Sequence, residues 1–207
     1  MRYGPEQRKT TRRRILAAAA RKFREGGFAG AGVDAVMAEA GLTAGGFYAH
    51  FESKEALLAE ALAAGPGHPG ERLAAGLDGT AGAPFLREVV RRYLSRSHRD
   101  DVAGGCALPA LAAEVARQGP EARAAFEGYL RRFVERLAPR VPGGPGLPPA
   151  ERVLATAALA AGGIMLARAV ADPGLSDRIL RACRRLAVPE LAEEAGQPRG
   201  SAGEMTP

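Results

Sequence analysis

The sequence has 207 residues, a length that suits one medium domain or two small ones, and its formal net charge is +6. It is rich in alanine and leucine, contains no tryptophan and lacks alternating β-branched runs, which argues against a β-sheet protein and predicts an all-α fold. Residues 1–24 hold nine Lys or Arg and one acid, a concentration of charge typical of proteins that bind nucleic acid.

The first predicted helix begins at Thr10 or Thr11, either of which can act as N-cap, and ends near Glu25, before a Gly-Gly pair. Apolar residues at helical spacing form its buried stripe, which consists of Ile15, Leu16, Ala19 and Phe23. The arginines between these positions, Arg12, Arg13 and Arg21, should face outward. We expect residues 1–7 to form a solvated tail in the free protein.

Residues 31–54 predict two short helices joined by a tight turn. The first has apolar residues at i, i+3, i+4 and i+7, namely Val33, Val36, Met37 and Ala40, with Gly32 as its N-cap. Gly41 can end it in a left-handed conformation, and Thr43 can cap a second helix over residues 44–51. Phe47 and Phe51, four residues apart, should be the buried face of that helix. Helix, glycine-containing turn and helix together form a helix-turn-helix pattern.

The second of these helices is almost free of side chains in its N-terminal half, where two glycines adjoin. Two glycines cost a short helix about 2 kcal/mol relative to alanine, and close approach of the backbone to the floor of a DNA major groove would offset this cost. The alternative is an ordinary core hairpin with a glycine-rich loop. Polar-tipped side chains and Lys54, which follows the N-cap Ser53, are candidates for phosphate contact. The predicted DNA contacts are Thr43, Ala44, Gly45, Gly46, Tyr48, Ala49, His50 and Lys54.

The stretch from residue 15 to residue 58 resembles the DNA-binding signature of TetR-type transcriptional regulators. The resemblance rests on GLT at 41–43, FY at 47–48, HF at 50–51, SKE at 53–55 and LL at 57–58. One position departs from it, because Gly32 stands where the family usually has threonine or serine. The resemblance implies a sequence-specific, homodimeric DNA-binding regulator, most often a repressor, that a small-molecule effector releases from a palindromic operator.

The rest of the chain predicts a further series of helices. A helix from Ser53 to Ala64 should connect the helix-turn-helix to the second half, and GPGHPG at 65–70 should end it. The later helices are expected over residues 71–77, 85–96, 106–117, 120–140, 149–171 and 175–187. We therefore expect a DNA-binding domain over 8–66, with its helix-turn-helix at 31–51, a helical regulatory and dimerisation domain over 67–192, and a disordered tail over 193–207.

The helix predicted from Glu151 to Ala171 has a broad apolar face of small residues: Leu154, Ala157, Ala158, Ala161, Gly162, Met165 and Ala169. Ala158 and Gly162, four residues apart, would let another helix approach closely. This face fits either the core of a monomer or a two-fold interface of four helices, to which each chain adds the helix from Leu175 to Ala187. The resemblance implies the homodimer.

The regulatory half of such proteins holds a small molecule in a helical pocket, so the resemblance makes some larger side chains pocket candidates. These are Phe85, Tyr93, Cys106, Leu111, Phe126, Tyr129, Phe133 and Met165, each of which fits plain core packing as well. Cys106 follows two glycines at a predicted helix start, where a thiol pKa falls. It could therefore be an oxidant or electrophile sensor, or only a small buried hydrophobe.

Other functions find little support in the sequence. No carboxylate or thiol lies at catalytic or metal-binding spacing from His50, His68 or His98, and the least implausible enzyme would pair Cys106 with His98. We therefore predict no enzyme, metal or cofactor. The apolar stretch over 153–167 looks too short to span a membrane, and no targeting segment is visible, so we expect a cytoplasmic location. A non-specific or architectural nucleic-acid-binding protein remains the alternative function.

Overall fold

The computed structural model describes residues 4–64 and 69–188, and within these ranges it contains no β-strand, which confirms the all-α prediction. Its elements, in chain order, are α1 (Pro5–Gly30), α2 (Val33–Glu39), η1 (Ala44–Ala49, a 3-10 helix), α3 (Lys54–Ala64), α4 (Pro69–Ala74), α5 (Gly82–Tyr93), α6 (Arg96–Asp100), α7 (Ala107–Val115), α8 (Pro120–Leu137), η2 (Ala138–Arg140, 3-10), α9 (Pro149–Ala169) and α10 (Pro173–Ala187). The predicted tail over 193–207, the segment 65–68 and His68 lie outside the described residues.

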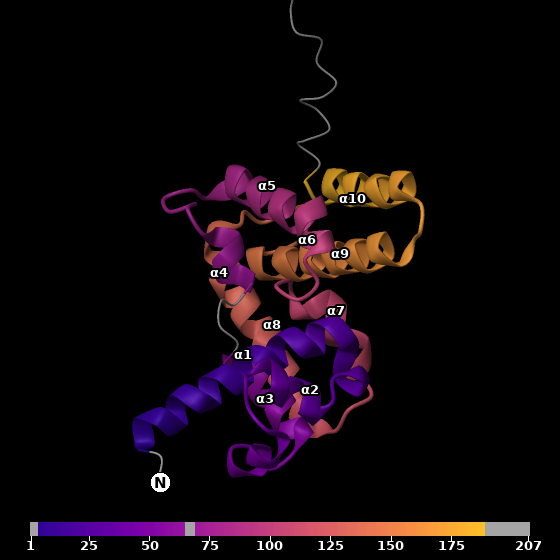
Figure 1. The fold of residues 1–207 in the computed structure, drawn as a ribbon. Coiled ribbons are helices and arrows are strands. Elements are labelled where there is room, and N and C mark those ends of the chain that lie inside the picture. The colour runs from indigo at the N-terminus through magenta and orange to yellow at the C-terminus, as the bar shows by residue number, and fades with distance from the viewer. Residues whose placement is uncertain (1–3, 65–68, 189–207) are drawn as a thin grey trace, which may run out of the picture.

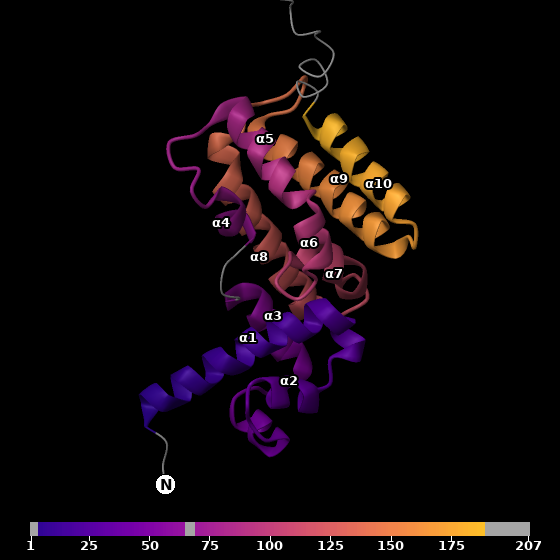
Figure 2. The ribbon, with the colours of Figure 1, turned by 45° about the horizontal axis from the view of Figure 1, so that its top comes forward.

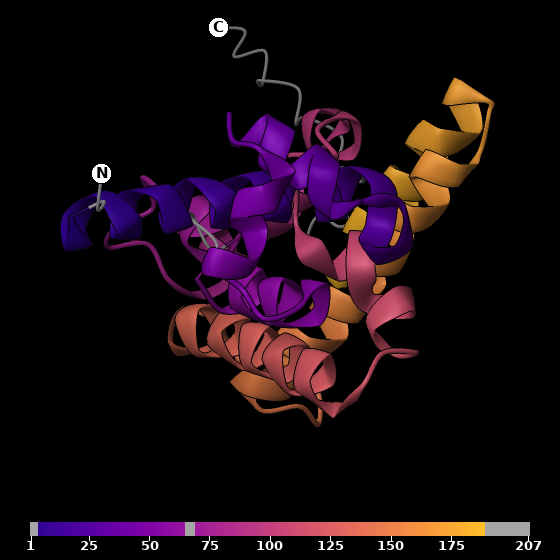
Figure 3. The same ribbon diagram turned by 60° about the horizontal axis from the view of Figure 1, so that its bottom comes forward.

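The helices form two groups in broad contact. The N-terminal helices α1 to α3 gather at one end of the molecule, and α9 and α10 lie side by side away from α2 (Figures 1 and 2). The third helix, α3, packs along α8, while α1 packs against α3 and α7. Viewed from the side of the N-terminal group, the end of the molecule where α9 and α10 join extends beyond the rest of the body (Figure 3). One continuous core of aliphatic and aromatic side chains joins both groups.

The first helix is longer than predicted, and the prediction of Thr10 or Thr11 as its N-cap is wrong. Gly4 is the N-cap and Pro5 the first helical residue, a position where the missing proline N–H and its fixed φ are no disadvantage. The expected tail therefore contributes an exposed first turn to α1, whose N-terminal half projects from the body (Figure 1). At the other end, Gly27 breaks the helix with φ 72° and ψ 176°.

A short helix was missed in the second half. Residues 97–101, which lie between the helices predicted over 85–96 and 106–117, lie in and directly after α6. The N-cap of α6 is Ser95, whose Oγ accepts a hydrogen bond from the His98 N–H at 3.1 Å. This capping compensates for the low apolar content of five residues that have no buried side chain of their own.

The longest apolar helix in the described residues is α9. By length and composition alone, its 21 residues, which include an 18-residue stretch with a mean hydropathy of 1.4, are sufficient to cross a membrane, contrary to the sequence-based expectation. One such helix is weak evidence for a span, since core helices of soluble proteins meet the same test. In this fold α9 packs against α7, α8 and α10, and one face of it stays exposed.

Candidate nucleic-acid interface

The turn between α2 and η1 has the geometry that the sequence predicts. Gly41 adopts a positive φ of 68°, and the Leu42 N–H returns to the Met37 carbonyl at 2.9 Å. The second element is a 3-10 helix over Ala44–Ala49 and not an α-helix to residue 51, because its amides bond three residues back, as Gly46 does to the Thr43 carbonyl at 3.1 Å. Thr43 occupies the N-cap position without a side-chain capping bond.

The two faces of η1 differ as predicted. Phe47 and Phe51 are 1% and 3% exposed, with their rings stacked at 5.8 Å, which confirms them as the buried face. The opposite face is open, and its exposed residues are Thr43, Ala44, Gly45, Tyr48 and Ala49, while Gly46 and His50 are half-buried. Tyr48 is 76% exposed, a large value for a tyrosine. Their roles as DNA contacts stay a prediction.

The glycines of η1 are not required by the chain itself. Neither Gly45 nor Gly46 has a positive φ, so any residue could adopt their backbone conformation. A Cβ at Gly45 would meet no atom within 4 Å, and one at Gly46 would meet only the Met37 methyl, at 3.7 Å. The two glycines weaken the helix, and no contact among the described residues requires them. Their lack of side chains therefore leaves room for the close approach of another molecule to this backbone.

The polar candidates at this surface are not equally free. Lys54 begins α3, and its Nζ lies 4.5 Å from the centroid of the Phe28 ring, a cation–π contact within the protein. Burial, followed by the charges of Arg8 and Arg12, lowers the pKa of His50, so its imidazole carries no charge at neutral pH. His50 can therefore offer a phosphate a hydrogen bond but no charge.

Three arginines of α1 bond to the helix-turn-helix: Arg12 is half-buried, while Arg8 and Arg14 do so from exposed positions. Arg8 and Arg12 donate to the Ala49 and His50 carbonyls at the C-terminal end of η1, and Arg14 Nη2 donates to the Ala40 carbonyl after α2 at 2.6 Å. The prediction that Arg12 faces outward is thus wrong. Between α1 and η1 lies an open groove of about 470 Å³, lined by Gln7, Arg8, Thr11, Arg14, Met37, Leu42, Thr43, Gly46, Ala49 and His50.

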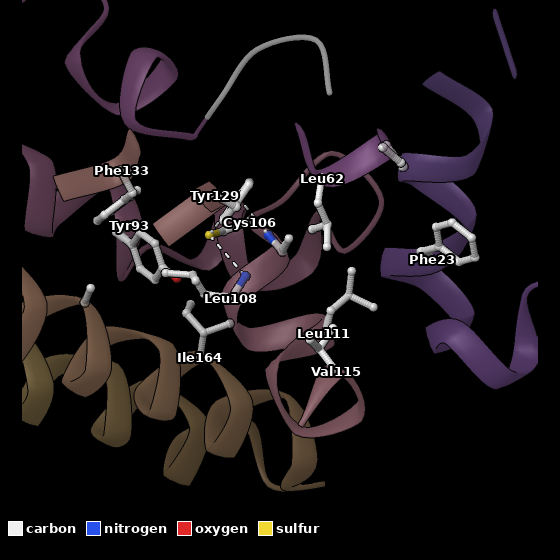
Figure 4. Packing of buried hydrophobic residues seen from close by; sticks show 14 of the residues in the cluster. Phe23, Leu62, Tyr93, Cys106, Leu108, Leu111, Val115, Tyr129, Phe133 and Ile164 are labelled. Atoms are coloured by element: carbon white, nitrogen blue, oxygen red, sulfur yellow. Dashed lines mark hydrogen bonds between the residues drawn. The ribbon is translucent and has the colours of Figure 1, made fainter. Parts of the chain in front are cut away.

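The predicted effector-pocket residues pack as core, and two of them, Tyr93 and Cys106, also line an open pocket of about 230 Å³ with Arg72, Leu73, Arg92, His98, Asp101 and Gly104. Phe85, Tyr93, Cys106, Leu111, Tyr129 and Phe133 are buried, and Phe126 is half-buried with its ring 6.2 Å from that of Tyr129. The space between α5, α8 and α9, which Tyr93 and Phe133 line, is a cavity of about 20 Å³, room for one water molecule. Figure 4 shows Leu111 and Val115 on the side of this cluster that faces Phe23 of α1. Met165 is wrongly assigned to the pocket, because it is 41% exposed on the outer face of α9.

Cys106 lacks both properties that a thiolate sensor needs. It is the N-cap of α7 and only 1% exposed, and its Sγ lies 3.5 Å from the Tyr129 hydroxyl (Figure 4). Burial raises the pKa of the Cys106 thiol, and its bonds with Tyr129 and the Leu108 amide offset this only in part. The predicted low pKa is wrong because desolvation outweighs the helix N-terminus. Cys183 on α10 is partly buried, and burial raises the pKa of its thiol too.

A network of hydrogen bonds, unpredicted from the sequence, joins the two groups of helices. The Glu114 side chain on α7 accepts the Phe28 N–H at 2.5 Å and the Ala29 N–H at 3.3 Å, just after the break in α1. Arg24 donates to the Ala103 carbonyl at 2.5 Å. The loop before α7 is therefore held by the same helix that holds η1. Partners 79 to 86 residues apart leave no local signal in a sequence.

His98 of α6 is half-buried beside this loop and uses both ring nitrogens. Its Nδ1 lies 2.6 Å from the Tyr93 carbonyl, which makes it the donor, and its Nε2 accepts the Cys106 N–H at 3.2 Å. Burial lowers the pKa of His98, and the charges of Arg168 and Arg72 lower it further, against the raising effect of the Tyr93 carbonyl and of Asp101. The folded protein therefore holds His98 neutral.

Acidification should destabilise the protein through His98 before it affects the carboxylates. Because the folded-state pKa lies below 6.5, the unfolded chain binds more protons as pH falls below 6.5, and stability is lost in that window. Glu88, whose pKa Arg91 and Arg92 lower to about 2, loses its contribution only at more acidic pH, below its ordinary value of 4.5. Melting temperatures between pH 7.5 and 5 should fall less for His98→Gln than for wild type. Parallel curves for the two proteins would refute this assignment.

Comparisons with known proteins agree with this geometry. Residues 15–61 match the family model described as bacterial regulatory proteins, tetR family. A TetR transcriptional regulator from Chloroflexus aurantiacus is 27% identical, with a TM-score of 0.68 over 91% of this chain and 97% of that one. A TetR family regulator from Cytophaga hutchinsonii is 22% identical (TM-score 0.69, 91% and 98% covered), and the reduced form of NemR from E. coli is 20% identical (0.69, 86% and 95%). No functionally curated protein matches the sequence.

Proposed function

We propose that the chain is a TetR-type DNA-binding regulator, which its match over residues 15–61 and its similarity to TetR-family structures support. It represses transcription from a palindromic operator, which it binds as a two-fold dimer and leaves when a small-molecule effector binds its regulatory helices. The observation that carries this proposal is the exposed face of η1, where glycines stand that nothing inside the chain requires. We further propose the division into a DNA-binding domain over 8–66 and a regulatory and dimerisation domain over 67–192.

Recognition of bases is assigned to the small residues of η1. Ala44, Gly45, Gly46 and Ala49 bring the backbone close to the base edges, where apolar contact with thymine methyls and the shape of the groove are read. Thr43, Tyr48 and Lys54 are assigned to phosphates, and His50 adds a neutral hydrogen bond. Phosphate contacts fix the position of η1 in the groove, and base contacts give the sequence preference.

The dimer is assigned to the outer faces of α9 and α10. Large apolar side chains remain exposed there in a single chain: Leu154, Met165, Leu166, Leu175 and Leu186 are 40% to 70% exposed. A Cβ at Gly162 would meet no atom of its own chain within 4 Å. An apolar face with a glycine that is open to the outside favours a helix of a second copy, paired by a two-fold axis.

The effector site is assigned to the regulatory helices, and no chemical class of effector is assigned. The core around Tyr129 and Phe133 is closed, so an effector that reaches it from the pocket beside Tyr93 and Cys106 would have to open the packing between α5, α8 and α9. Opening of this kind would shift α7 and α8, which pack against α1 and α3. Effector binding and DNA binding would then favour different arrangements of the same helices.

The test of the proposed function is a gel-shift comparison between the DNA upstream of the protein's own gene and random DNA of equal length, at moderate salt. The proposal expects the upstream DNA, or a palindrome within it, to bind about a thousand times more tightly. An architectural protein would bind both with a steep salt dependence but with similar affinity. Equal affinities for the two DNAs would reject the regulator in favour of that alternative.

Lys54→Ala should weaken binding to every DNA alike. Loss of one phosphate contact should make the slope of log K against log salt shallower by about one unit and leave the order of preferred sequences unchanged. Fluorescence anisotropy titrations at four salt concentrations measure both quantities. A variant with changed sequence preference and an unchanged slope would show that Lys54 acts through its contact with Phe28 instead.

Ala49→Gln should change which bases are preferred. Its side chain would enter the groove from an exposed position on η1, where glutamine can form a bidentate contact with adenine worth about 1–3 kcal/mol. Selection from a randomised library should therefore yield a different binding motif for the variant than for wild type. Identical motifs would remove position 49 from the base-reading surface.

A further inference from the structure

The recognition element η1 has little helical stability of its own. It is six residues long, contains two glycines, and its N-cap Thr43 makes no side-chain capping bond. Isolated helices of this length do not persist in water. Its burial of Phe47 anchors one residue to the core, but does not fix the direction of the exposed residues around it. Something else must hold the C-terminal end of η1 in place.

That end is held by two side chains of α1. The carbonyls of a C-terminal helical turn lack partners within the helix, and here Arg8 Nη2 donates to the Ala49 carbonyl at 2.8 Å and Arg12 Nη1 to the His50 carbonyl. The two arginines come from positions 41 and 38 residues earlier in the chain. Cationic donors at a helix C-terminus also stabilise its dipole.

Arg12 has three simultaneous contacts, which use the planar shape of its guanidinium. One Nη bonds the His50 carbonyl, the other bonds both carboxylate oxygens of Glu60 on α3, and the group lies 4.3 Å from the centroid of the Phe51 ring. With its charge paired and its donors directed inward, Arg12 is poorly placed to bind a phosphate. A lysine could not reproduce this arrangement, because an ammonium lacks the fork and the flat face.

We propose that Arg12 is a positioning residue for DNA recognition: it ties the C-terminal end of η1 to α1 and α3, so that the glycine-rich face enters the groove in one orientation. The inference rests on the proposed function, since it concerns how the operator is read. It assigns a structural role inside the domain to a half-buried residue that charge pattern alone places in a phosphate-binding arm. Arg8 assists at the same end of η1 from an exposed position.

Salt dependence and a lysine variant separate this role from a phosphate contact. Arg12→Ala should lower affinity for the operator about tenfold or more, lower affinity for random DNA far less, and leave the salt slope unchanged. Arg12→Lys should not restore operator binding, although it keeps the charge.

Glu60→Ala should also weaken operator binding, although it removes a negative charge near the DNA and would strengthen binding if charge alone mattered. Arg13→Ala is the matched control, since exposed Arg13 forms an ion pair with Glu6, at 3.8 Å, and has no other polar partner among residues 4–64 and 69–188.

Circular dichroism spectra and melting curves check that each variant is folded. If Arg12→Ala does not fold, the operator affinities of Arg12→Lys and Glu60→Ala test the proposal instead. A salt slope reduced by about one unit in Arg12→Ala, with binding restored by lysine, would overturn the proposal and make Arg12 a phosphate contact. Wild-type affinity in both Arg12→Ala and Glu60→Ala would overturn it as well. Failure of the wild-type protein to prefer its operator is a separate result, which rejects the proposed function itself.

Discussion

Gly27→Ala should lower the melting temperature by about 10 °C, the largest loss of stability that we expect from a single methyl group in this chain. Gly27 has φ 72° and ψ 176°, a region that is open almost only to glycine. An added Cβ would clash with Glu114 Oε1 and lie 2.8 Å from Glu114 Cδ, so the carboxylate would have to move and leave the Phe28 and Ala29 N–H groups unpaired. Strain and unpaired amides together cost about 3–5 kcal/mol.

The neighbouring glycine provides the control. Gly26 is helical, and the nearest atom to an added Cβ is the Ala31 nitrogen at an unstrained 3.7 Å. Gly26→Ala should therefore stabilise the protein by about 0.5–1 kcal/mol through higher helix propensity. Differential scanning calorimetry of the two variants measures the contrast. Equal melting temperatures would show that the contact between α1 and Glu114 does not contribute to stability.

Gly162→Leu should convert the dimer into a folded monomer and reduce operator affinity about a hundredfold or more, because each half-site alone gives only part of the binding energy. The leucine would project from α9 into space that is free in a single chain and filled by the partner in the proposed dimer. Light scattering measures the mass, and gel shift the affinity. A variant that stays dimeric would place the interface elsewhere.

Gly163, the next residue, faces inward and should respond in the opposite way. An added Cβ there would lie 2.8 Å from Cys183 Sγ and 3.2 Å from Leu94 Cδ2. Gly163 therefore lets α9 and α10 pack closely within one chain, and a side chain at this position would push them apart. Gly163→Ala should cost about 1–3 kcal/mol of folding stability, as overpacked cores do, while the dimer persists at low temperature. If Gly162→Leu affects only the dimer and Gly163→Ala only the folding stability, one face of α9 lies in the dimer interface and the other in the core of the single chain.

The sequence was sufficient for features that depend on local spacing. The turn at Gly41, the burial of Phe47 and Phe51 and the exposure of the residues between them follow from helical periodicity over a few positions. The N-cap at Ser53 likewise appears as predicted, with its Oγ accepting the Ala56 N–H at 3.0 Å. These elements define the candidate interface, which is why it could be located before the fold was known.

Features that depend on distant partners could not be predicted. Nothing near Arg12 in the sequence indicates His50, Glu60 or Phe51 as its partners, and composition alone assigned it to a basic surface. The place of Cys106 at a helix start leaves both a reactive thiol and a buried hydrophobe open, and the choice depends on its burial against Tyr93 of α5 and Tyr129 of α8. The sequence also does not show which side of α9 faces the core. Residues 153–167 are apolar almost all round, so no polar side indicates the direction of Gly162, Gly163 or Met165.

The measurement that tests the central claim most directly is selection of binding sites by the wild-type protein from a library of randomised double-stranded DNA. Two copies of η1 related by a two-fold axis predict enrichment of an inverted repeat, with half-sites centred about 10 base pairs or a multiple of that distance apart. The Ala49→Gln protein, selected from the same library, should enrich a repeat with the same spacing and different bases. Enrichment of no sequence, or of one without two-fold symmetry, would contradict a dimeric regulator that reads DNA through residues 43–49.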